Sequence, residues 1–301
     1  MSNKLNNNVQ AGELLVSKKY KKRSQMGEII HHLSKNKGAM AGLIILGIMV
    51  LLFIISLFIR WEAITQINPH ARFAPPSWQH PFGADNFGRD LFLRVIFGTR
   101  YTLAICIGSV AFAAIFGVTA GCFAGFYGGK VEDIIMRASD VIASIPSMLL
   151  GMVVVTVLGQ SLFNLTIAVG VSSIPIYLRM TRASILSVRN NEYVEAAKAI
   201  GLSNTRIIFT QVLPNGLAPI FVTLTASLGI SIISASSLSY LGFGVPVPHP
   251  EWGAIIAGAK EFARNAPNLM MFPGIFIMLT VLAFNLLGDG LRDALDPKMK
   301  K

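Results

Sequence analysis

Long runs without a charged residue, separated by short polar stretches, dominate this chain. Five such runs span residues 38–59, 101–129, 141–178, 207–250 and 265–288. Each is at least as long as the roughly 20 residues that an apolar helix needs to cross the hydrocarbon core of a bilayer. The pattern therefore predicts a chain that is helical and embedded in a membrane.

The third run, residues 141–178, is too long for a single crossing. Gly159, Gln160, Ser161 and Asn164 offer a turn near its middle, so we expect two helices there. The sequence thus predicts an all-α, polytopic membrane protein with six transmembrane helices. We place these helices near residues 39–59, 101–126, 138–158, 162–180, 216–240 and 271–289.

Basic residues fall mainly on one side of these six spans. If both termini and the loops at 127–137 and 179–214 lie in the cytoplasm, 19 of the 26 Lys and Arg lie there too. Positively charged loops usually remain cytoplasmic, so this topology is favoured. The net charge of +11 is then explained by contact with anionic membrane lipid, and no nucleic-acid partner is needed.

The first residues of the chain are polar and rich in Asn and Lys. Ile29, Ile30 and Leu33 then form an apolar stripe that is typical of a short helix at the membrane interface. A cleaved signal peptide is the alternative, but the apolar run that follows is longer than the apolar core of such a peptide. We divide the chain into a cytoplasmic tail with an interfacial helix at 1–38, a first transmembrane helix and outer loop at 39–100, and a core at 101–301 that contains a cytoplasmic loop at 189–214.

That polar loop, between the fourth and fifth predicted spans, has the character of a docking segment. Asn190 and Asn191 can cap a short helix that Gly201 ends, because glycine tolerates the left-handed conformation. Ser203 can cap a second short helix, which Pro214 is expected to close. The residues whose small size would allow another protein to approach closely are Ala196, Ala197 and Gly201.

This segment resembles the EAA loop of permease subunits of ABC importers. The family pattern is Glu-Ala-Ala, three residues, Gly, and later a hydrophobic-Leu-Pro ending; Gln211 stands here where members often carry His. The resemblance implies that this loop couples the permease to an ATPase by a polar contact, a close backbone fit and a junction with the fifth span. The residues implied in these three roles are Glu195; Ala196, Ala197 and Gly201; and Leu213 with Pro214.

Other segments narrow the resemblance to permeases for dipeptide, oligopeptide and nickel uptake. They lie at residues 80–100, 121–146, 239–253 and 284–297, and the last contains a Gly-Asp-Gly-Leu-Arg-Asp sequence similar to the second permease subunit of that family. The resemblance implies an ABC type I importer permease fold in the bacterial cytoplasmic membrane. It also implies three kinds of partner: a second, homologous permease, two ATP-binding subunits, and an extracytoplasmic solute-binding protein.

The segment before the second predicted span has the composition of a compact cap. Gly83 and Gly88 favour tight turns, and Asp85, Arg89 and Asp90 can pair with one another. We interpret this cap as structural in preference to a site of direct substrate contact.

Side chains near the ends of the spans are also interpreted as structural. Trp61, Trp78 and Trp252 fall near predicted outer boundaries, where aromatic rings anchor helices among the lipid headgroups. Asp140 is expected to form an interfacial ion pair with Arg137.

Hydroxyl residues recur within the fifth predicted span. Thr223, Ser227, Ser231 and Ser234 are separated by four, four and three residues, which places them on one helical face. They are candidates for the lining of a translocation path, or they allow helices to pack closely, and packing is the favoured interpretation.

The sequence lacks the motifs of an enzyme. It contains no Gly-x-x-x-x-Gly-Lys-Ser/Thr phosphate loop, its five His show no metal-ligand spacing, and Cys106 and Cys122 are interpreted as buried core residues. We therefore expect no cofactor, no catalytic residue, and ATP hydrolysis by separate subunits. The predicted function is a permease subunit of an ATP-driven peptide importer. The alternatives are a nickel or metal-chelate importer of the same family and a secondary transporter.

Overall fold

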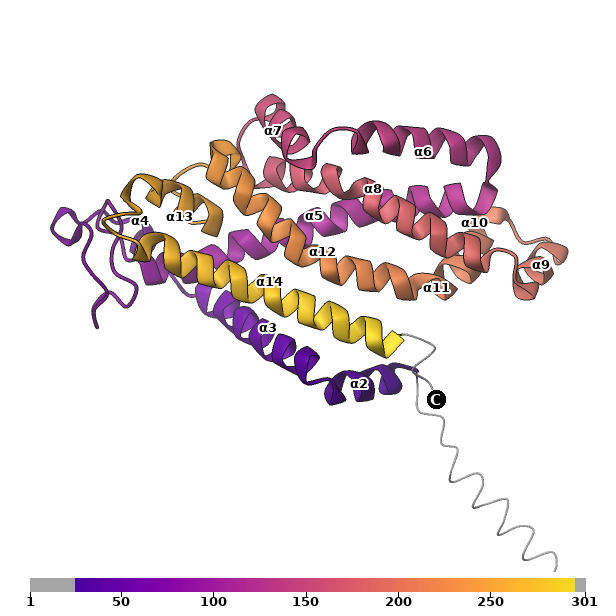
Figure 1. Cartoon of the computed structure of the whole chain (residues 1–301), viewed down its shortest axis with the longest axis horizontal. Helices are drawn as coiled ribbons and strands as arrows, with labels where there is room; N and C mark the ends of the chain where they lie inside the picture. The colour runs from indigo at the N-terminus through magenta and orange to yellow at the C-terminus, as the bar shows by residue number, and fades with distance from the viewer. Residues whose placement is uncertain (1–24, 296–301) are drawn as a thin grey trace, which may run out of the picture.

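Long helices run along the molecule in its computed structural model, which describes residues 25–295 (Figure 1). Five of the described helices are each long and apolar enough to cross a membrane. They are α3 (Lys37–Ser56), α5 (Leu91–Tyr127), α8 (Leu162–Val188), α12 (Leu217–Leu238) and α14 (Asn268–Leu295). The all-α prediction is confirmed for the described residues.

The short elements gather at the two ends of this bundle (Figure 1). One end, called the α13 end below, carries α4 (Trp61–Thr65), the turn Pro69–Ala71 and α13 (Trp252–Ala259). The other, called the α9 end, carries α9 (Glu192–Ala199), α10 (Asn204–Ile207) and α11 (Leu213–Asn215). These short helices therefore form two separate regions of the molecule.

Side-chain caps and glycines fix where the long helices begin and end. The Asp90 carboxylate accepts a hydrogen bond from the Leu93 amide at 2.9 Å, and the Ser161 hydroxyl accepts one from the Asn164 amide at 3.0 Å. These bonds satisfy amides that have no partner inside the helix. At the other end of α5, Gly128 adopts a φ of 68°, which a residue with a side chain rarely does.

The second span begins ten residues earlier than the sequence predicts, at Leu91 instead of residue 101. Two arginines misled the prediction, because a charge normally marks a loop. Arg94 is buried, and the Nε of Arg100 donates to the Ser56 hydroxyl at 2.9 Å. A charged residue that has partners inside the protein need not end a helix.

The third predicted span, residues 138–158, is not one straight helix. Its place is taken by α6 (Gly129–Ala143) and α7 (Ser147–Leu158), which are bent by 86° relative to each other. Pro146 stands immediately before α7 and has no amide hydrogen to continue the α6 ladder. The described residues thus contain six spans only if this bent pair is counted as one.

Ion pairs hold α6 alongside α8. Arg179 donates to the Asp140 carboxylate at 2.8 Å, and Arg182 pairs with Glu132. The predicted pairing of Asp140 with Arg137 is therefore wrong, since the partner comes from another helix. The helix α8 also continues beyond its predicted end at residue 180, to Val188, and Arg182 in this extension pairs with Glu132 of α6.

A row of glycines brings α5 and α8 into backbone contact. Gly117, Gly121 and Gly125 recur every fourth residue of α5, along one face. A Cβ added at Gly121 would lie 2.6 Å from the Leu178 carbonyl oxygen, and one at Gly125 would lie 2.8 Å from the Cβ of Ile185. In membranes, such small residues permit close van der Waals packing between helices.

The helix α2 (Gln25–Lys35) lies beside α14 at the α9 end (Figure 1). Asn36, between α2 and α3, connects this part of the chain to α14. Its side chain caps α3 at the Ala39 amide and donates to the carboxylate of Asp293 in α14 at 3.1 Å. The short helix expected before the first span is therefore present. Residues 1–24 and 296–301 lie outside the described residues, as do the side chains of Ile29 and Ile30, on which the predicted apolar stripe depends.

Buried aromatic and sulfur side chains complete the packing. Trp252 has no exposed surface, and its indole N–H donates to the Val95 carbonyl at 2.8 Å. The prediction that Trp252 anchors the chain among lipid headgroups is wrong, because its ring is enclosed by protein. Cys106 and Cys122 are both buried, as predicted.

Candidate functional site

The predicted docking segment is a chain of short helices at the α9 end. Gly201 ends α9 with a φ of 81°, as expected. Its amide donates to the Lys198 carbonyl at 3.0 Å, and the next amide, of Leu202, donates to the Ala197 carbonyl at 3.2 Å. This pair of bonds is the Schellman arrangement, in which a left-handed residue closes a helix. The segment therefore turns sharply at Gly201.

Three local expectations for this segment are wrong. Asn191 and Ser203 occupy the N-cap positions of α9 and α10, but their side chains make no capping hydrogen bond. Pro214 does not close the second helix. The chain stays helical through a π turn at Ile208–Val212 and through α11, where Pro214 lies in the first turn and needs no amide partner. The break comes at Gly216.

The segment has one face on the bundle and one face free. Val194 and Ala197 are buried in a cluster with Cys122, Ile207 and Val212. Leu213 packs at the edge of that cluster. The four other predicted coupling residues are exposed, namely Glu195, Ala196, Gly201 and Pro214. The predicted set thus divides into an anchoring part and a part that is available to a partner.

Polar contacts tie the segment to α5 and α8. The Arg189 guanidinium donates to the Gly125 carbonyl at 2.9 Å, and the Ser184 hydroxyl donates to the Gly216 carbonyl at 2.6 Å. The Lys198 ammonium lies 5.3 Å from the centre of the Phe126 ring. The segment is therefore bonded to both α5 and α8. Arg189 was not predicted as a site residue, and its only signal was its place at the start of the loop at 189–214.

The four hydroxyl residues of α12 do not share one surface. Thr223 and Ser227 line a cavity of about 740 Å³ that also includes Arg292. Ser234 lines a separate cavity of about 120 Å³. Ser231 is buried, and its hydroxyl donates to the Leu228 carbonyl of its own helix at 2.8 Å. The structure thus gives these residues different surroundings.

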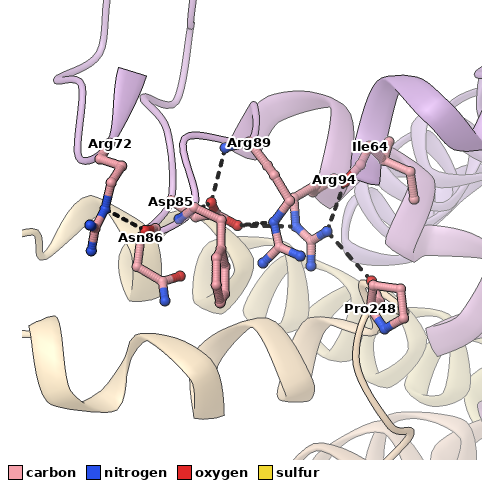
Figure 2. A network of polar contacts seen from close by, with 8 residues as sticks. Ile64, Arg72, Asp85, Asn86, Arg89, Arg94 and Pro248 are labelled. Atoms are coloured by element: carbon pink, nitrogen blue, oxygen red, sulfur yellow. Dashed lines mark hydrogen bonds and ion pairs between the residues drawn. The ribbon is translucent and has the colours of Figure 1, made fainter. Parts of the chain in front are cut away.

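At the α13 end, Asp85 organises a charged network (Figure 2). One of its oxygens accepts hydrogen bonds from the amides of Phe87 and Arg89 at 2.9 and 3.0 Å. The other accepts one from the Arg89 Nε at 2.7 Å and lies 3.6 Å from the Arg94 Nε. The predicted cap with paired charges is confirmed for Asp85 and Arg89. Arg94 was not predicted to join it.

The remaining charge of the cap has a different partner. Asp90 pairs with His80, whose Nδ1 lies 2.7 Å from the carboxylate oxygen, and not with Arg89. Gly88 has a φ of 74°, and an added Cβ there would lie 1.8 Å from the Asn68 carbonyl oxygen. Only glycine fits this turn, which explains why the loop is so compact.

A second acidic residue near this end is fully buried. Glu251 precedes α13 and accepts hydrogen bonds from the amides of Gly253 and Ala254 at 2.9 and 2.8 Å. Burial raises the pKa of the Glu251 carboxyl above its usual 4.5, although the hydrogen bonds from Gly253 and other donors oppose this shift. The folded chain therefore holds this proton more tightly than the unfolded chain does.

This difference predicts a pH dependence of stability. The contribution of protonated Glu251 is complete below pH 4.5 and is lost as the pH rises through the higher pKa of the folded state. In Glu251→Gln the unfolding temperature should fall less than in the parent protein as the pH is raised from 4.5 to neutrality. Thermal unfolding in detergent measures this, with the exposed Glu261→Gln as control. Identical pH profiles for parent and Glu251→Gln would contradict the expectation.

Two protein-family models match the chain. Residues 24–76 match the N-terminal TM domain of oligopeptide transport permease C. Residues 117–301, more than half of the chain, match the binding-protein-dependent transport system inner membrane component family. The chain belongs to this family. Its members are transport permeases, so the resemblance found in the sequence is confirmed.

Relatives of this permease match it along most of their own length. It is 44% identical to the dipeptide transport system permease protein DppC of Alkalihalophilus pseudofirmus, over 91% of this chain and 90% of that protein. It is 40% identical to the di/tripeptide transport system permease protein DppC of Pseudomonas aeruginosa, over 92% and 93%. It is 41% identical to the glutathione transport system permease protein GsiD of Pectobacterium atrosepticum, over 86% of both.

A solved structure supports the fold of this permease. The inward-facing MetNI methionine ABC transporter contains a chain that aligns with a TM-score of 0.57 at 19% identity. The alignment covers 68% of the present chain and 98% of that chain. At this identity the likeness shows the fold alone, and it confirms the ABC importer permease fold.

Proposed function

We propose that this permease is one of two homologous membrane subunits of an ATP-driven importer for dipeptides and other short peptides in the bacterial cytoplasmic membrane. Three relatives named for dipeptide, di/tripeptide and glutathione transport support the peptide substrate. The observation that carries the proposal is the two-faced segment around α9, which is anchored to the bundle and offers a free surface. Such a segment suits a joint with a separate ATPase.

In this proposal two ATP-binding subunits supply the energy. The exposed face of α9 docks on one of them, with Glu195 forming the polar contact and Ala196 and Gly201 allowing close approach. Ala197 fixes the segment to the bundle, and Leu213 with Pro214 joins it to α12. When ATP-binding subunits close around nucleotide, the segment moves as a lever and shifts α5, α8 and α12.

The arrangement of the ends supports a topology for the proposal. The described N-terminal helix α2 and the C-terminal end of α14 both lie at the α9 end (Figure 1). A cytoplasmic α9 end would place both termini in the cytoplasm beside the ATPases. The α13 end would then face the extracytoplasmic solute-binding protein. The division of the chain at residues 38 and 100 remains a prediction within this topology.

The second permease subunit would complete the path. The cavity of about 740 Å³ beside Thr223 and Ser227 is proposed as this subunit's contribution to that path at the cytoplasmic side. For Ser231 and Ser234 a packing role is favoured, because Ser231 is buried and bonded to its own helix.

Reconstitution in proteoliposomes tests the proposal. The permease, its partner permease, the two ATP-binding subunits and the binding protein are combined, and uptake of a labelled dipeptide is measured with ATP and with a nonhydrolysable analogue. We expect uptake only with ATP, and competition by tripeptides but not by nickel. Uptake without ATP would favour a secondary transporter, and transport of nickel in place of peptides would favour the metal importer.

A further inference from the structure

A cavity of about 380 Å³ lies at the α13 end, beside the Asp85 network. This volume is within the range of about 300–1,000 Å³ that is typical of small-molecule sites. Asp85, Arg89 and Arg94 contribute charged groups to its wall. Gln160 contributes an amide, and Val245, Ile255 and Leu269 contribute apolar surface. The wall thus combines segments far apart in the chain: the outer loop, the start of α5, the turn before α8, and the region around α13.

The charges at this wall do not balance. The side chains of Arg89, Arg94 and Asp85 are only 9%, 5% and 10% exposed. The two guanidinium groups lie side by side and share the single carboxylate (Figure 2). Arg94 directs its Nη1 to neutral acceptors, the carbonyls of Ile64 at 2.9 Å and Pro248 at 3.5 Å. One positive charge is therefore left over.

The neighbouring acids do not supply the missing negative charge. Asp90 is paired with His80 and caps α5. Glu251 is directed to the amides at the start of α13, and burial favours its neutral form. An uncompensated charge that is buried costs several kcal/mol. This cost is removed when an anion enters the cavity.

The geometry of the donors indicates which anion fits. Arg89 uses its Nε for Asp85, and within residues 25–295 no hydrogen bond from its two Nη atoms to the protein is found. Its guanidinium is held 4.6 Å from the centre of the Phe87 ring. A planar fork of two N–H donors matches a carboxylate, which accepts both in parallel. The two arginines exceed the Asp85 carboxylate by one positive charge, and a carboxylate carries the one negative charge that balances it.

We infer that this cavity binds the C-terminal carboxylate of the transported peptide, with the guanidinium groups of Arg89 and Arg94 as donors. This inference rests on the proposed function, because every unmodified peptide carries such a group. The apolar wall would accept the last side chain of the peptide. The site would therefore receive a peptide released from the binding protein by reading a group that is common to all peptides, whatever their sequence.

Equilibrium dialysis on the complete importer without its binding protein tests the inference. The probes are a radiolabelled dipeptide and the same dipeptide with a C-terminal amide. We expect the amide to bind at least about tenfold more weakly to the parent protein, because a neutral amide cannot accept the two charge-assisted hydrogen bonds of a carboxylate. In Arg94→Gln the acid should lose at least that factor and bind no better than the amide, whereas Arg94→Lys should retain part of the preference.

Controls separate this inference from misfolding and from the proposed function. Arg60→Gln removes an exposed arginine that pairs with Glu62 and does not line the cavity, and it should bind the acid like the parent. Copurification of the ATP-binding subunits with each variant reports assembly.

If the parent transports the dipeptide but does not distinguish acid from amide, the inference fails and the proposed function stands. If Arg94→Gln instead weakens only the docking of the binding protein, the carboxylate belongs to that protein and the inference is wrong. A parent importer that transports no dipeptide contradicts the proposed function itself.

Discussion

Replacing Gly121 with Leu is expected to prevent the subunit from accumulating in folded form in the membrane. A Cβ at this position would lie 2.6 Å from the Leu178 carbonyl oxygen and 2.7 Å from the Cβ of Thr181, and backbone cannot move aside as a flexible side chain can. Overpacking typically costs about 1–3 kcal/mol, and a clash with backbone lies at or above the upper end. That is a large part of the roughly 5–15 kcal/mol by which proteins are stable.

The matched control for this prediction is Gly47→Leu. Gly47 also lies inside a membrane helix, α3, but nothing lies within 4 Å of a Cβ built there. The amount of detergent-extracted monodisperse subunit should fall at least about tenfold for Gly121→Leu and stay near the parent value for Gly47→Leu. Equal yields for the two variants would show that the contact between α5 and α8 is less close than described.

Replacing Ala197 with Asp is expected to abolish ATP-driven uptake while the subunit still inserts in the membrane. Ala197 is 7% exposed and packs with Val194 and Ile207, which are fully buried. A carboxylate there would be desolvated without a partner, which costs several kcal/mol. The five long helices have the length and apolar composition of membrane spans without this segment, so we expect the change to release the segment and to leave insertion intact.

Uptake by reconstituted importer and the amount of membrane-inserted subunit are measured together. Ala63→Asp serves as the control, because Ala63 is an exposed alanine in α4 at the opposite end of the molecule. We expect at least about a hundredfold loss of uptake for Ala197→Asp, on the basis of about 2.7 kcal/mol or more, and little loss for Ala63→Asp. Uptake near the parent level in Ala197→Asp would mean that burial of position 197 is not needed for coupling.

Local patterns predicted much of the fold because membrane helices are recognised by length and lack of charge. Five long helices follow the charge-free runs, and Gly201 and Gly88 adopt the left-handed conformations that their turns require. The failures involve contacts between distant residues. The start of α5 depends on the partners of Arg94, at Ile64 and Pro248, and no local window contains them.

The candidate site shows the same limit. The sequence motif selected Ala196 and Ala197 together, but adjacent residues on a helix point in directions about 100° apart. Only the structure shows that position 197 faces the cluster with Cys122 and that position 196 is exposed. The glycines at 117, 121 and 125 were not predicted to pack a helix, because their partner α8 is distant in the chain. The burial of Glu251 likewise results from the packing of the folded chain and not from its neighbours in sequence.

Cross-linking from position 196 tests the central claim, that the free face of α9 contacts an ATP-hydrolysing subunit. The two native cysteines, Cys106 and Cys122, are buried, so Ala196→Cys adds an accessible thiol while the native thiols stay shielded from the reagent. In the transporting importer, a thiol-directed cross-linker should join this thiol to the ATP-hydrolysing subunit, with a yield that changes when nucleotide binds. An impermeant thiol reagent that labels position 196 from outside intact cells, or a transporting complex in which it never links to that subunit, would contradict the account.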